Sequence, residues 1–513
     1  MGRCGIACKE LYNHPERKNS TCFALPPPLV ERAFLLGQQG GALQRLQKRL
    51  ACAKARRTHV KLSIVAAGGS VTAGPGGKSW ANHMFQWLGS HPLPSTHRPY
   101  LTFLNGKLSA NGVGPSYFSG CWDHHAAVWN GTTVPDLVFL EYAINDMRDA
   151  STVDIEALIR RLAAQGTIVV LLHHFTPAFM AHGNGYRGIS TTAEWKHARV
   201  ATHYGLSTIS FGEAVGLSQT STPWRRANAR PGRTAAHRSA IDDPRDWTDA
   251  MLHPCAFQCA FTEDNMHPTV CGQKMIAELS IHALQRLLLL DEPWDERTVK
   301  GWDACNEVRT TGPCQLLPPP LSWHDQGSDH QYRCESTRPT PCWSNVGARE
   351  TWNLWPLRKR GFKLINLKAG GGELAKGVVK MLWQGRIRGS FAEFEVRCPS
   401  QTYLGVRLMY LQETKFLNYG LARVEIDDAK VATLSGHRSK GGTLFISQDL
   451  AFPAKCKGLF CRRRDADTHI VRITILDPSD APEEAARYHV SHLGFGVNAI
   501  MCMRTLKPET AYQ

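Results

Sequence analysis

The sequence predicts an α/β domain with a parallel sheet, followed by an antiparallel β-sandwich. Between about residues 58 and 290, short apolar runs alternate with amphipathic stretches. This alternation is typical of βαβ units, in which helices cover both faces of a parallel sheet. Beyond residue 350 the helical period fades, and apolar runs are separated by Gly, Asp and Lys, which favours a sandwich. At 513 residues the chain is also too long for one compact unit.

The elements of the α/β region follow in order from this alternation. Each expected strand is a short apolar run, and each expected helix has apolar residues at a spacing of three or four. The expected strands are 60–67, 100–105, 136–142, 167–172 and 206–211, and the expected helices are 77–90, 115–128, 151–165, 192–204 and 270–290. In the second half, strands are expected at 362–369, 391–398, 402–411, 420–427, 443–447 and 469–476.

Three further segments complete the expected organisation. Residues 1–57 form a basic extension, in which Leu43, Leu46 and Leu50 indicate an amphipathic helix over 41–57. The stretch 214–240 carries five arginines and no acidic residue, and we interpret it as a surface insertion into the domain at 58–290. Residues 291–349 form a Pro-rich linker to the sandwich domain at 350–513.

Composition narrows the class of protein. Hydrophobic residues make up 42% and charged residues 20%, which excludes a disordered chain. The apolar runs are too short for a transmembrane segment. A net charge of +16 suits an anionic partner such as an acidic polysaccharide, a membrane surface or nucleic acid, or it reflects a basic proteome. Of these partners we expect no nucleic acid, and oligomeric state stays open.

The compartment is left open by conflicting signals. Sixteen cysteines and sequons at Asn19 and Asn130 suggest the secretory pathway, whereas the printed N-terminus has no apolar signal core. Two pairs, Cys255 with Cys259 and Cys456 with Cys461, could each be half of a zinc site, but neither has a second pair at zinc-finger spacing. We therefore expect no structural zinc.

A serine follows the first expected strand in the segment GGSVTAG, 68–74. A Ser on a Gly-flanked strand-to-helix turn exposes its hydroxyl beside backbone N–H groups that can stabilise an oxyanion. A plain loop is the alternative interpretation. A phosphate-binding loop ending at Gly77-Lys78-Ser79 is disfavoured, because it requires Gly where Thr72 stands.

Two more short motifs lie at the ends of other elements. Asn145 and Asp146 directly follow the strand at 136–142, where an Asn amide can meet developing negative charge. Asp264 and His267 precede the last helix at a spacing of three, at which a carboxylate can fix the tautomer of an imidazole. Each motif alone is weak, and their order along the chain is the stronger signal.

Together these motifs make residues 58–290 resemble the SGNH (GDSL-type) hydrolase family. The nucleophile block reads Gly68-Gly69-Ser70, the Asn block reads 143–146 with Ala in place of the usual Gly, and the final block keeps Asp264 and His267. The segment NGVGPS, 111–116, is assigned as the remaining block, with Gly114 as its oxyanion donor and Gly112 as the alternative. The added sandwich is similar in outline to plant and algal members that carry such a domain.

The resemblance implies a flavodoxin-like α/β/α sandwich and carboxyl-ester hydrolysis without a cofactor. Ser70 is the implied nucleophile, His267 the base and Asp264 its partner, with Ser70, Gly114 and Asn145 forming the oxyanion hole. The expected substrate is an acyl ester of a glycan, such as an acetylated polysaccharide, or a small ester. The alternatives are a glycan O-acyltransferase and an inactive SGNH-fold protein that binds glycan or protein.

Other polar and aromatic residues received weaker interpretations. His173 and His174 follow the fourth strand, where they line a pocket or are simply solvated. Asp123, His124 and His125 suggest a metal cluster only if a fourth ligand comes from elsewhere. Three tryptophans are expected in packing roles: Trp80, Trp87 and Trp122.

Overall fold

The computed structural model forms two compact units. The first consists of Met1–Ser109 and Val134–Thr337, and the second of Ala110–Thr133 and Arg338–Gln513. The structure describes residues 25, 30–31, 33–37, 39–55, 58–74, 78–90, 101–109, 112–126, 134–146, 152–174, 193–214, 267–288, 340–347, 353–366, 379–399, 403–412, 419–437, 444–453, 467–488 and 493–503. Both sequons, nearly all of the Arg-rich insertion and the paired Cys motifs lie outside these residues.

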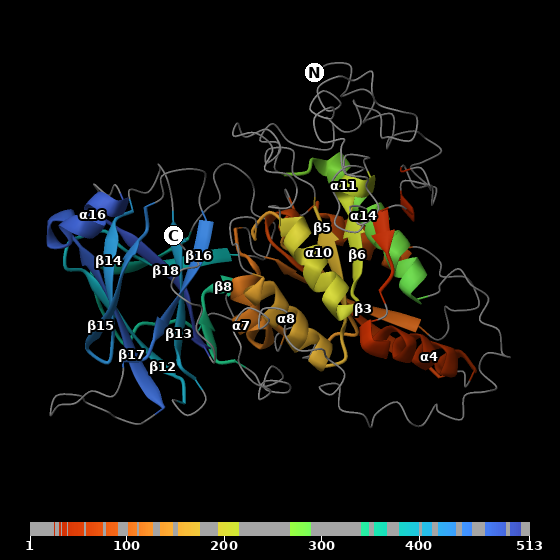
Figure 1. The fold of residues 1–513 in the computed structure, drawn as a ribbon, viewed down its shortest axis with the longest axis horizontal. Helices are drawn as coiled ribbons and strands as arrows, with labels where there is room; N and C mark the ends of the chain where they lie inside the picture. The colour runs from red at the N-terminus through yellow and green to blue at the C-terminus, as the bar shows by residue number, and fades with distance from the viewer. Residues whose placement is uncertain are drawn as a thin grey trace, which may run out of the picture. The chain divides into compact units, whose positions relative to one another are not determined.

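The first unit is built on a mixed sheet of six strands (Figure 1). Its order is β1-β6-β5-β4-β2-β3, in which only β1 runs antiparallel to its neighbour. The parallel strands are rich in Val, Ile, Leu and Ala, as expected for strands that are buried on both faces. Their bounds are β1 (Phe34–Leu35), β2 (Val60–Gly68), β3 (Leu101–Ser109), β4 (Leu137–Glu141), β5 (Ile168–His173) and β6 (Ser207–Ser210).

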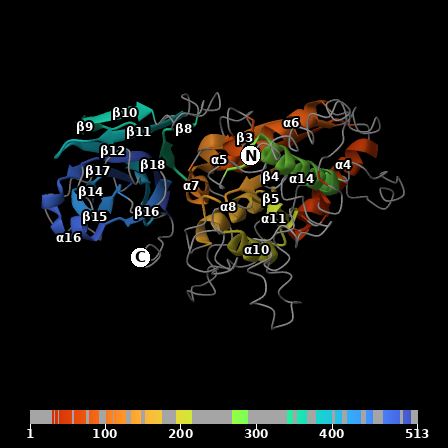
Figure 2. The same ribbon diagram turned by 90° about the horizontal axis from the view of Figure 1, so that it is seen from above.

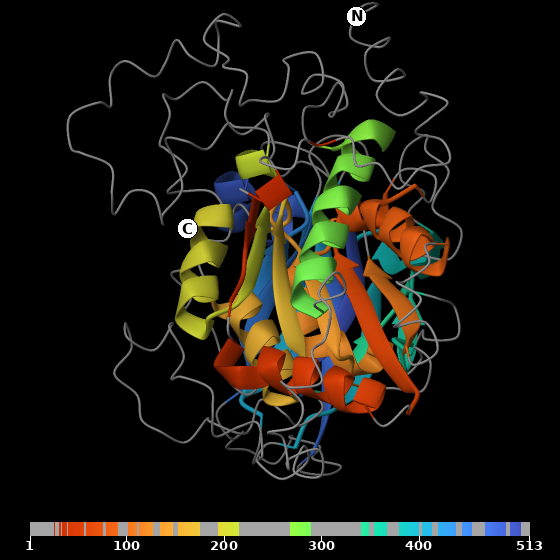
Figure 3. The same cartoon turned by 90° about the vertical axis from the view of Figure 1, so that its right-hand side faces the viewer.

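Helices cover both faces of this sheet. On one face lie α4 (Ala42–Ala55), α6 (Trp80–Ser90) and α14 (Val270–Leu288), which share one apolar core with alternate residues of the strands (Figure 3). On the other face lie α8 (Val153–Ala164) and α10 (Ala193–Tyr204) (Figure 2). The short elements η1 (Gln39–Gly41), α5 (Ser70–Ala73) and α11 (Phe211–Ala214) occupy connections. The predicted α/β class is confirmed.

The strand order identifies a crevice at one edge of the sheet. After β2 the chain forms β3 on one side of β2, and it then crosses to form β4 on the other side. In open parallel sheets, ligands bind at the carboxyl ends of the strands, where the strand order reverses in this way. That point lies between the ends of β2 and β4, whose last residues, Gly68 and Glu141, are register partners.

The second unit contains two antiparallel sheets around one core. The first has the order β10-β11-β18-β13-β16, with β7 and β8 paired at its margin, and the second has the order β15-β14-β17-β12-β9 (Figure 1). The main strands are β10 (Phe362–Asn366), β11 (Val379–Gly385), β12 (Phe391–Arg397), β13 (Gly405–Gln412), β14 (Leu421–Ile426), β15 (Ala429–Ser435), β16 (Leu444–Ala451), β17 (Thr468–Leu476) and β18 (Phe495–Met503). The shorter strands are β7 (Cys342–Ser344), β8 (Val346–Gly347) and β9 (Arg358–Arg360), and η12 (Pro478–Asp480) and α16 (Pro482–Tyr488) follow β17.

The core of this unit lies between its two sheets. Alternate residues of β12 and β13 point into it, among them Phe394 and Leu408, and both are buried. A disulfide between Cys398 and Cys502 adds a covalent link between the end of β12 and strand β18 of the other sheet. The predicted antiparallel sandwich is confirmed, although the segment 342–347, expected in the linker, forms its strands β7 and β8.

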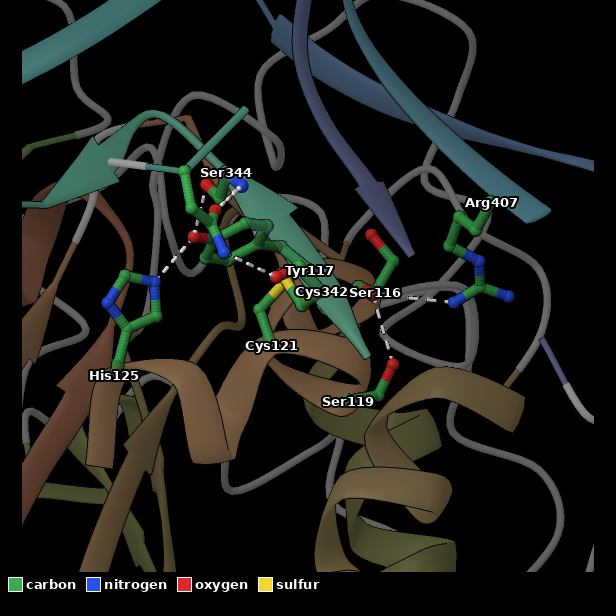
Figure 4. Close-up of a disulfide and its surroundings, with 9 residues drawn as sticks. Ser116, Tyr117, Ser119, Cys121, His125, Cys342, Ser344 and Arg407 are labelled. Carbon is green, nitrogen blue, oxygen red and sulfur yellow. Dashed lines mark hydrogen bonds between the residues drawn. A yellow bond between two sulfur atoms is a disulfide. The ribbon is translucent and has the colours of Figure 1, made fainter. Parts of the chain in front are cut away.

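Helix α7 (Pro115–Ala126) belongs to the second unit, although the sequence places it in the α/β region. A disulfide joins Cys121 of α7 to Cys342 of β7, and the hydroxyl of Tyr117 is hydrogen-bonded to Ser344 Oγ at 2.7 Å (Figure 4). Arg407 of β13 donates to the carbonyl of Ser116 at 3.4 Å. Helix α7 is therefore tied to the sandwich strands by a covalent bond and by hydrogen bonds.

Candidate active site

The turn that carries Ser70 is tight because two glycines precede it. Gly68 ends β2, and Ser70 begins the single turn of α5. A Cβ atom on Gly68 would lie 2.0 Å from Thr72 Oγ1, and one on Gly69 would lie 1.7 Å from Asn145 Oδ1. Both distances are shorter than real Cβ contacts, so a side chain at either position would require Thr72 or Asn145 to shift.

The structure brings Ser70 and His267 together. Ser70 Oγ lies 2.9 Å from His267 Nε2, although the two residues are 197 positions apart in the chain. Both side chains are half-buried, so each keeps a surface open to solvent. A hydroxyl and an imidazole at this distance form the pair that nucleophilic catalysis requires, with the imidazole as the acceptor of the hydroxyl proton.

Gln273, in the first turn of α14, links the segment that carries Ser70 to the segment that carries His267. Its Nε2 donates to the carbonyl of Val71 at 3.1 Å, and its Oε1 accepts from the backbone N–H of Trp80 at 2.7 Å. The side chain is 1% exposed, so both hydrogen bonds form away from water. Since His267 lies just before α14 and Ser70 begins α5, Gln273 links the segments that carry them.

Asn145 approaches the same turn from the end of β4. The backbone N–H of Gly69 donates to the carbonyl of Glu141 at 3.2 Å, which fixes the two strand ends side by side. The Asn145 side chain lies against the Cα of Gly69, the residue that precedes Ser70. Among the described residues, Asn145 Oδ1 is buried without a hydrogen-bond partner. Asn145 therefore stands next to the serine turn, as the sequence predicts.

A buried polar chain lies beneath the serine turn. The hydroxyl of Thr72 donates to Glu141 Oε2 at 3.1 Å and accepts from the indole N–H of Trp80 at 3.3 Å. Glu141 is fully buried, and its Oε1 has no partner within the described part of the chain. Burial raises the pKa of Glu141 to about 8, so this carboxyl group is protonated at neutral pH.

Two buried histidines, one in α10 and one at the end of β5, lie close to each other. His197 of α10 donates from Nε2 to Asp146 Oδ2 at 2.7 Å, and burial lowers the pKa of His197 to about 3. His173 at the end of β5 is 0% exposed, burial lowers its pKa, and neither ring nitrogen has a partner among the residues that the structure describes. With His174 3% exposed, the interpretation of these two histidines as solvated is wrong.

The other predicted site residues have different outcomes. Gly112 and Gly114 belong to the second compact unit, and Asp264 lies outside the described residues. His125 pairs with Tyr117, and burial lowers its pKa to about 3. Within the described ranges, no group of three or more His, Cys, Asp or Glu residues is arranged to hold a metal. Trp80 and Trp122 are fully buried, and Trp87 packs against the core, as predicted.

Sequence reasoning missed Gln273, Thr72 and Glu141. Glu141 gave a usable signal, because it is an acidic residue at the end of an otherwise apolar strand. Gln273 gave none, since a glutamine in the first turn of a helix is ordinary. Its role depends on contacts to Val71 and Trp80, which lie about two hundred positions earlier.

Comparisons with known proteins give structural matches only. No family model matches the chain, and no curated protein matches it. A two-domain esterase (CEX) active on acetylated mannans matches with 16% sequence identity and a TM-score of 0.49, covering 93% of this chain and 99% of that chain. TesA matches with 17% identity and a TM-score of 0.30, covering 44% of this chain and 99% of its own.

The sandwich has matches of its own. A family 35 carbohydrate binding module from Clostridium thermocellum matches with 11% identity and a TM-score of 0.19, covering 33% of this chain and 100% of that chain. At these identities and TM-scores, the likenesses assign no activity to the chain. The activity is therefore inferred from the arrangement of its own side chains.

Proposed function

We propose that the protein is a serine hydrolase that acts on carboxyl esters. The observation that carries this proposal is the 2.9 Å contact between Ser70 Oγ and His267 Nε2. The pair lies at the carboxyl edge of a parallel sheet, beside the point where the strand order reverses and ligands bind. The contact also weighs against an inactive member of the fold, since an inactive site has no need to keep it.

The proposed reaction passes through an acyl-enzyme. His267 Nε2 accepts the proton of Ser70 as Oγ attacks the carbonyl carbon of the ester, which forms a tetrahedral oxyanion. The intermediate collapses, His267 returns the proton to the departing alkoxide, and the acyl group stays on Ser70. Water, deprotonated by His267, then attacks the acyl carbonyl and releases the carboxylic acid.

The oxyanion is assigned to donors from three segments of the chain. These are the backbone N–H of Ser70, the side-chain amide of Asn145 and the backbone N–H of Gly114. The position of Asn145 against Gly69 supports its inclusion. The inclusion of Gly114 rests on the sequence, in which its segment follows the predicted second strand. Each such donor typically contributes about 3–4 kcal/mol to transition-state stabilisation.

Asp264 is proposed to orient His267. Its spacing of three from His267 lets the carboxylate accept the other ring N–H of the imidazole, which selects the tautomer with a free Nε2. This assignment rests on sequence alone.

The proposed substrate class is the acyl ester of a glycan, with acetyl as the expected group. The chain has a net charge of +16, which favours an acidic polymer. The disulfides Cys121–Cys342 and Cys398–Cys502 are typical of oxidising compartments, where such polymers occur. An O-acyltransferase would use the same acyl-enzyme with a sugar hydroxyl in place of water.

The nucleophile is tested by labelling and turnover. The protein should hydrolyse a short acetyl ester and react with a fluorophosphonate probe, and Ser70→Ala should abolish both without changing the melting temperature. Ser90→Ala is the matched control, because Ser90 is exposed at the end of α6. A folded protein that neither labels at Ser70 nor turns over acetyl esters would contradict the proposal.

A further inference from the structure

The edge strand β9 presents an unusual row of side chains. All three of its residues, Arg358, Lys359 and Arg360, are exposed. Among the described residues, this strand is the last in the order of its five-stranded sheet, and it pairs with β12. Charges on an edge strand discourage pairing with another chain, so the row alone has an ordinary structural explanation.

The turn between β11 and β12 extends this positive surface. Arg360 Nη2 donates to the carbonyl of Gly389 at 3.3 Å, which places the turn beside β9. Arg386 and Arg388 of the same turn are exposed. We call the five cations of β9 and the turn, together with Trp355, the basic edge.

The protection of an edge strand by charged side chains does not explain Trp355. Its side chain is 54% exposed, and Leu357 beside it is 53% exposed. Exposed apolar groups next to an edge strand promote association, which is the opposite of protection. The indole is held in place, because its ring packs edge-on against Trp383 with centroids 5.7 Å apart, and Lys359 Nζ lies 4.3 Å from the Trp383 ring centroid.

The charges of the basic edge are only partly neutralised. Glu393 lies 3.9 Å from Arg358 but closer to Arg472, at 3.4 Å. Asp480 pairs with Arg388, and Asp477 also interacts with this guanidinium group. With five cations and these three carboxylates, two positive charges remain in excess. Arginine guanidinium groups bind carboxylates and sulfates in a bidentate manner, which favours an anionic ligand.

We propose that the basic edge binds an acidic polysaccharide. The flat face of Trp355 suits the C–H-rich face of a sugar ring, and the neighbouring cations suit the carboxylates or sulfates carried by such a chain. An extended polymer can also follow an edge strand, whose successive side chains point to opposite faces of the sheet and so flank the edge on both sides. The disulfides in the same unit are typical of proteins from oxidising compartments, which favours a glycan over nucleic acid.

The test measures binding separately from hydrolysis. The full chain carrying Ser70→Ala is titrated with polygalacturonate and with neutral dextran at low ionic strength, so failure of the esterase proposal does not affect the result. We expect polygalacturonate to bind, dextran not to bind, and added salt to weaken the binding. Trp355→Ala should weaken it about tenfold, as loss of a central aromatic contact does.

A charge-matched control separates the basic edge from net charge. Arg358→Gln with Arg360→Gln should weaken binding about tenfold, whereas Lys430→Gln with Arg487→Gln, which removes the same charge from exposed positions on β15 and α16, should leave it unchanged. Equal losses in both pairs would overturn the proposal. It would also be overturned if the edge variants self-associate in size-exclusion chromatography with unchanged binding, or if a DNA duplex binds more tightly through the same residues.

Discussion

Arg407 in the sandwich unit and Glu141 and His173 in the α/β unit are all buried and titratable, but their polar atoms are satisfied differently. In the sandwich unit, Arg407 is buried and both oxygens of Asp449 accept from it, at 2.6 and 3.0 Å. In the α/β unit, Glu141 and His173 are fully buried, yet Glu141 Oε1 and both ring nitrogens of His173 lack partners among the described residues. Their pKa values are shifted toward the neutral form as a result.

The difference in how these buried groups are paired bears on where the proposed site lies. A buried ion pair stabilises one arrangement of its two side chains. If either partner is removed, the other is left as an uncompensated charge in a medium of low dielectric constant. Buried titratable groups with shifted pKa values are enriched at functional sites, and Glu141 and His173 end β4 and β5, two neighbouring strands of the sheet. The contrast therefore points to the same edge of the sheet as the Ser70–His267 contact.

The largest effect is expected where a buried pair is broken. Arg407→Leu leaves Asp449 buried without its cation, which should lower the free energy of unfolding by about 3–5 kcal/mol. Arg407→Leu with Asp449→Leu should recover much of that loss, since no charge is then stranded. Urea unfolding measures both. A double variant as unstable as the single one would mean that Arg407 acts mainly through its bond to the Ser116 carbonyl.

A smaller effect is expected at the proposed oxyanion donor. Asn145→Ala should lower kcat about 10²–10³-fold with little change in KM, because the amide acts on charge that develops in the transition state. Steady-state kinetics on an acetyl ester provide the measurement. Asn82→Ala on α6 makes the same chemical change outside the serine turn and should leave kcat unaltered. An unchanged kcat in Asn145→Ala would remove this residue from the oxyanion hole.

A third effect, a change in pH dependence, is expected at Glu141. Its pKa is about 8 when folded and about 4.5 when unfolded, so between these values the folded protein holds a proton that the unfolded chain has released. Stability from this group is therefore present below pH 4.5 and is lost as pH rises toward 8, by at most about 1.4 kcal/mol per pH unit.

The matching variant is Glu141→Gln, which keeps the shape and an acceptor for Thr72 but does not titrate. Its unfolding free energy, measured by urea at pH 5, 6.5 and 8, should fall less steeply than that of the unaltered protein. Parallel curves would show that Glu141 is ionised in the fold, and the contrast between the two units would then weaken.

Much of the fold could be predicted from local patterns. The strand expected at 60–67 is β2 (Val60–Gly68), and the helix expected at 270–290 is α14 (Val270–Leu288), because apolar periodicity is a local property. Strand β3 extends to Ser109, beyond the expected end at 105, through the polar stretch Asn105–Gly106–Lys107. Its pairing with β2 along nine residues overrides the local composition.

The sandwich was predicted less completely. Strands β11, β15 and β18 were not singled out, nor was the helix α16, although each is defined in the structure. The placement of α7 could not be foreseen, because it depends on Cys342, Ser344 and Arg407, all more than two hundred residues away. Within the described residues, no helix has the length and apolar character needed to cross a membrane.

Only some residues of the candidate site could be predicted from the sequence. Ser70, Asn145 and His267 were chosen because they stand at the ends of predicted elements, and the structure places Ser70 beside His267, with Asn145 at the serine turn. The supports of the site, Gln273 and Thr72, were missed. Each of these residues acts through a contact that forms only when elements distant in the sequence pack together. No local sequence pattern therefore indicates its role.

The Cys121–Cys342 disulfide has a consequence for biosynthesis. The two cysteines are separated by 221 residues, which at 5–20 residues per second corresponds to about 10–45 seconds between their emergence from the ribosome. During that interval the aromatic face of α7 has no strand of the sandwich to cover it. Ten other cysteines emerge before Cys342, and six of them follow Cys121, at positions 255, 259, 271, 305, 314 and 334. The Cys121 thiol thus meets competing partners before its own, and correct pairing becomes a late step in maturation that thiol–disulfide exchange must complete.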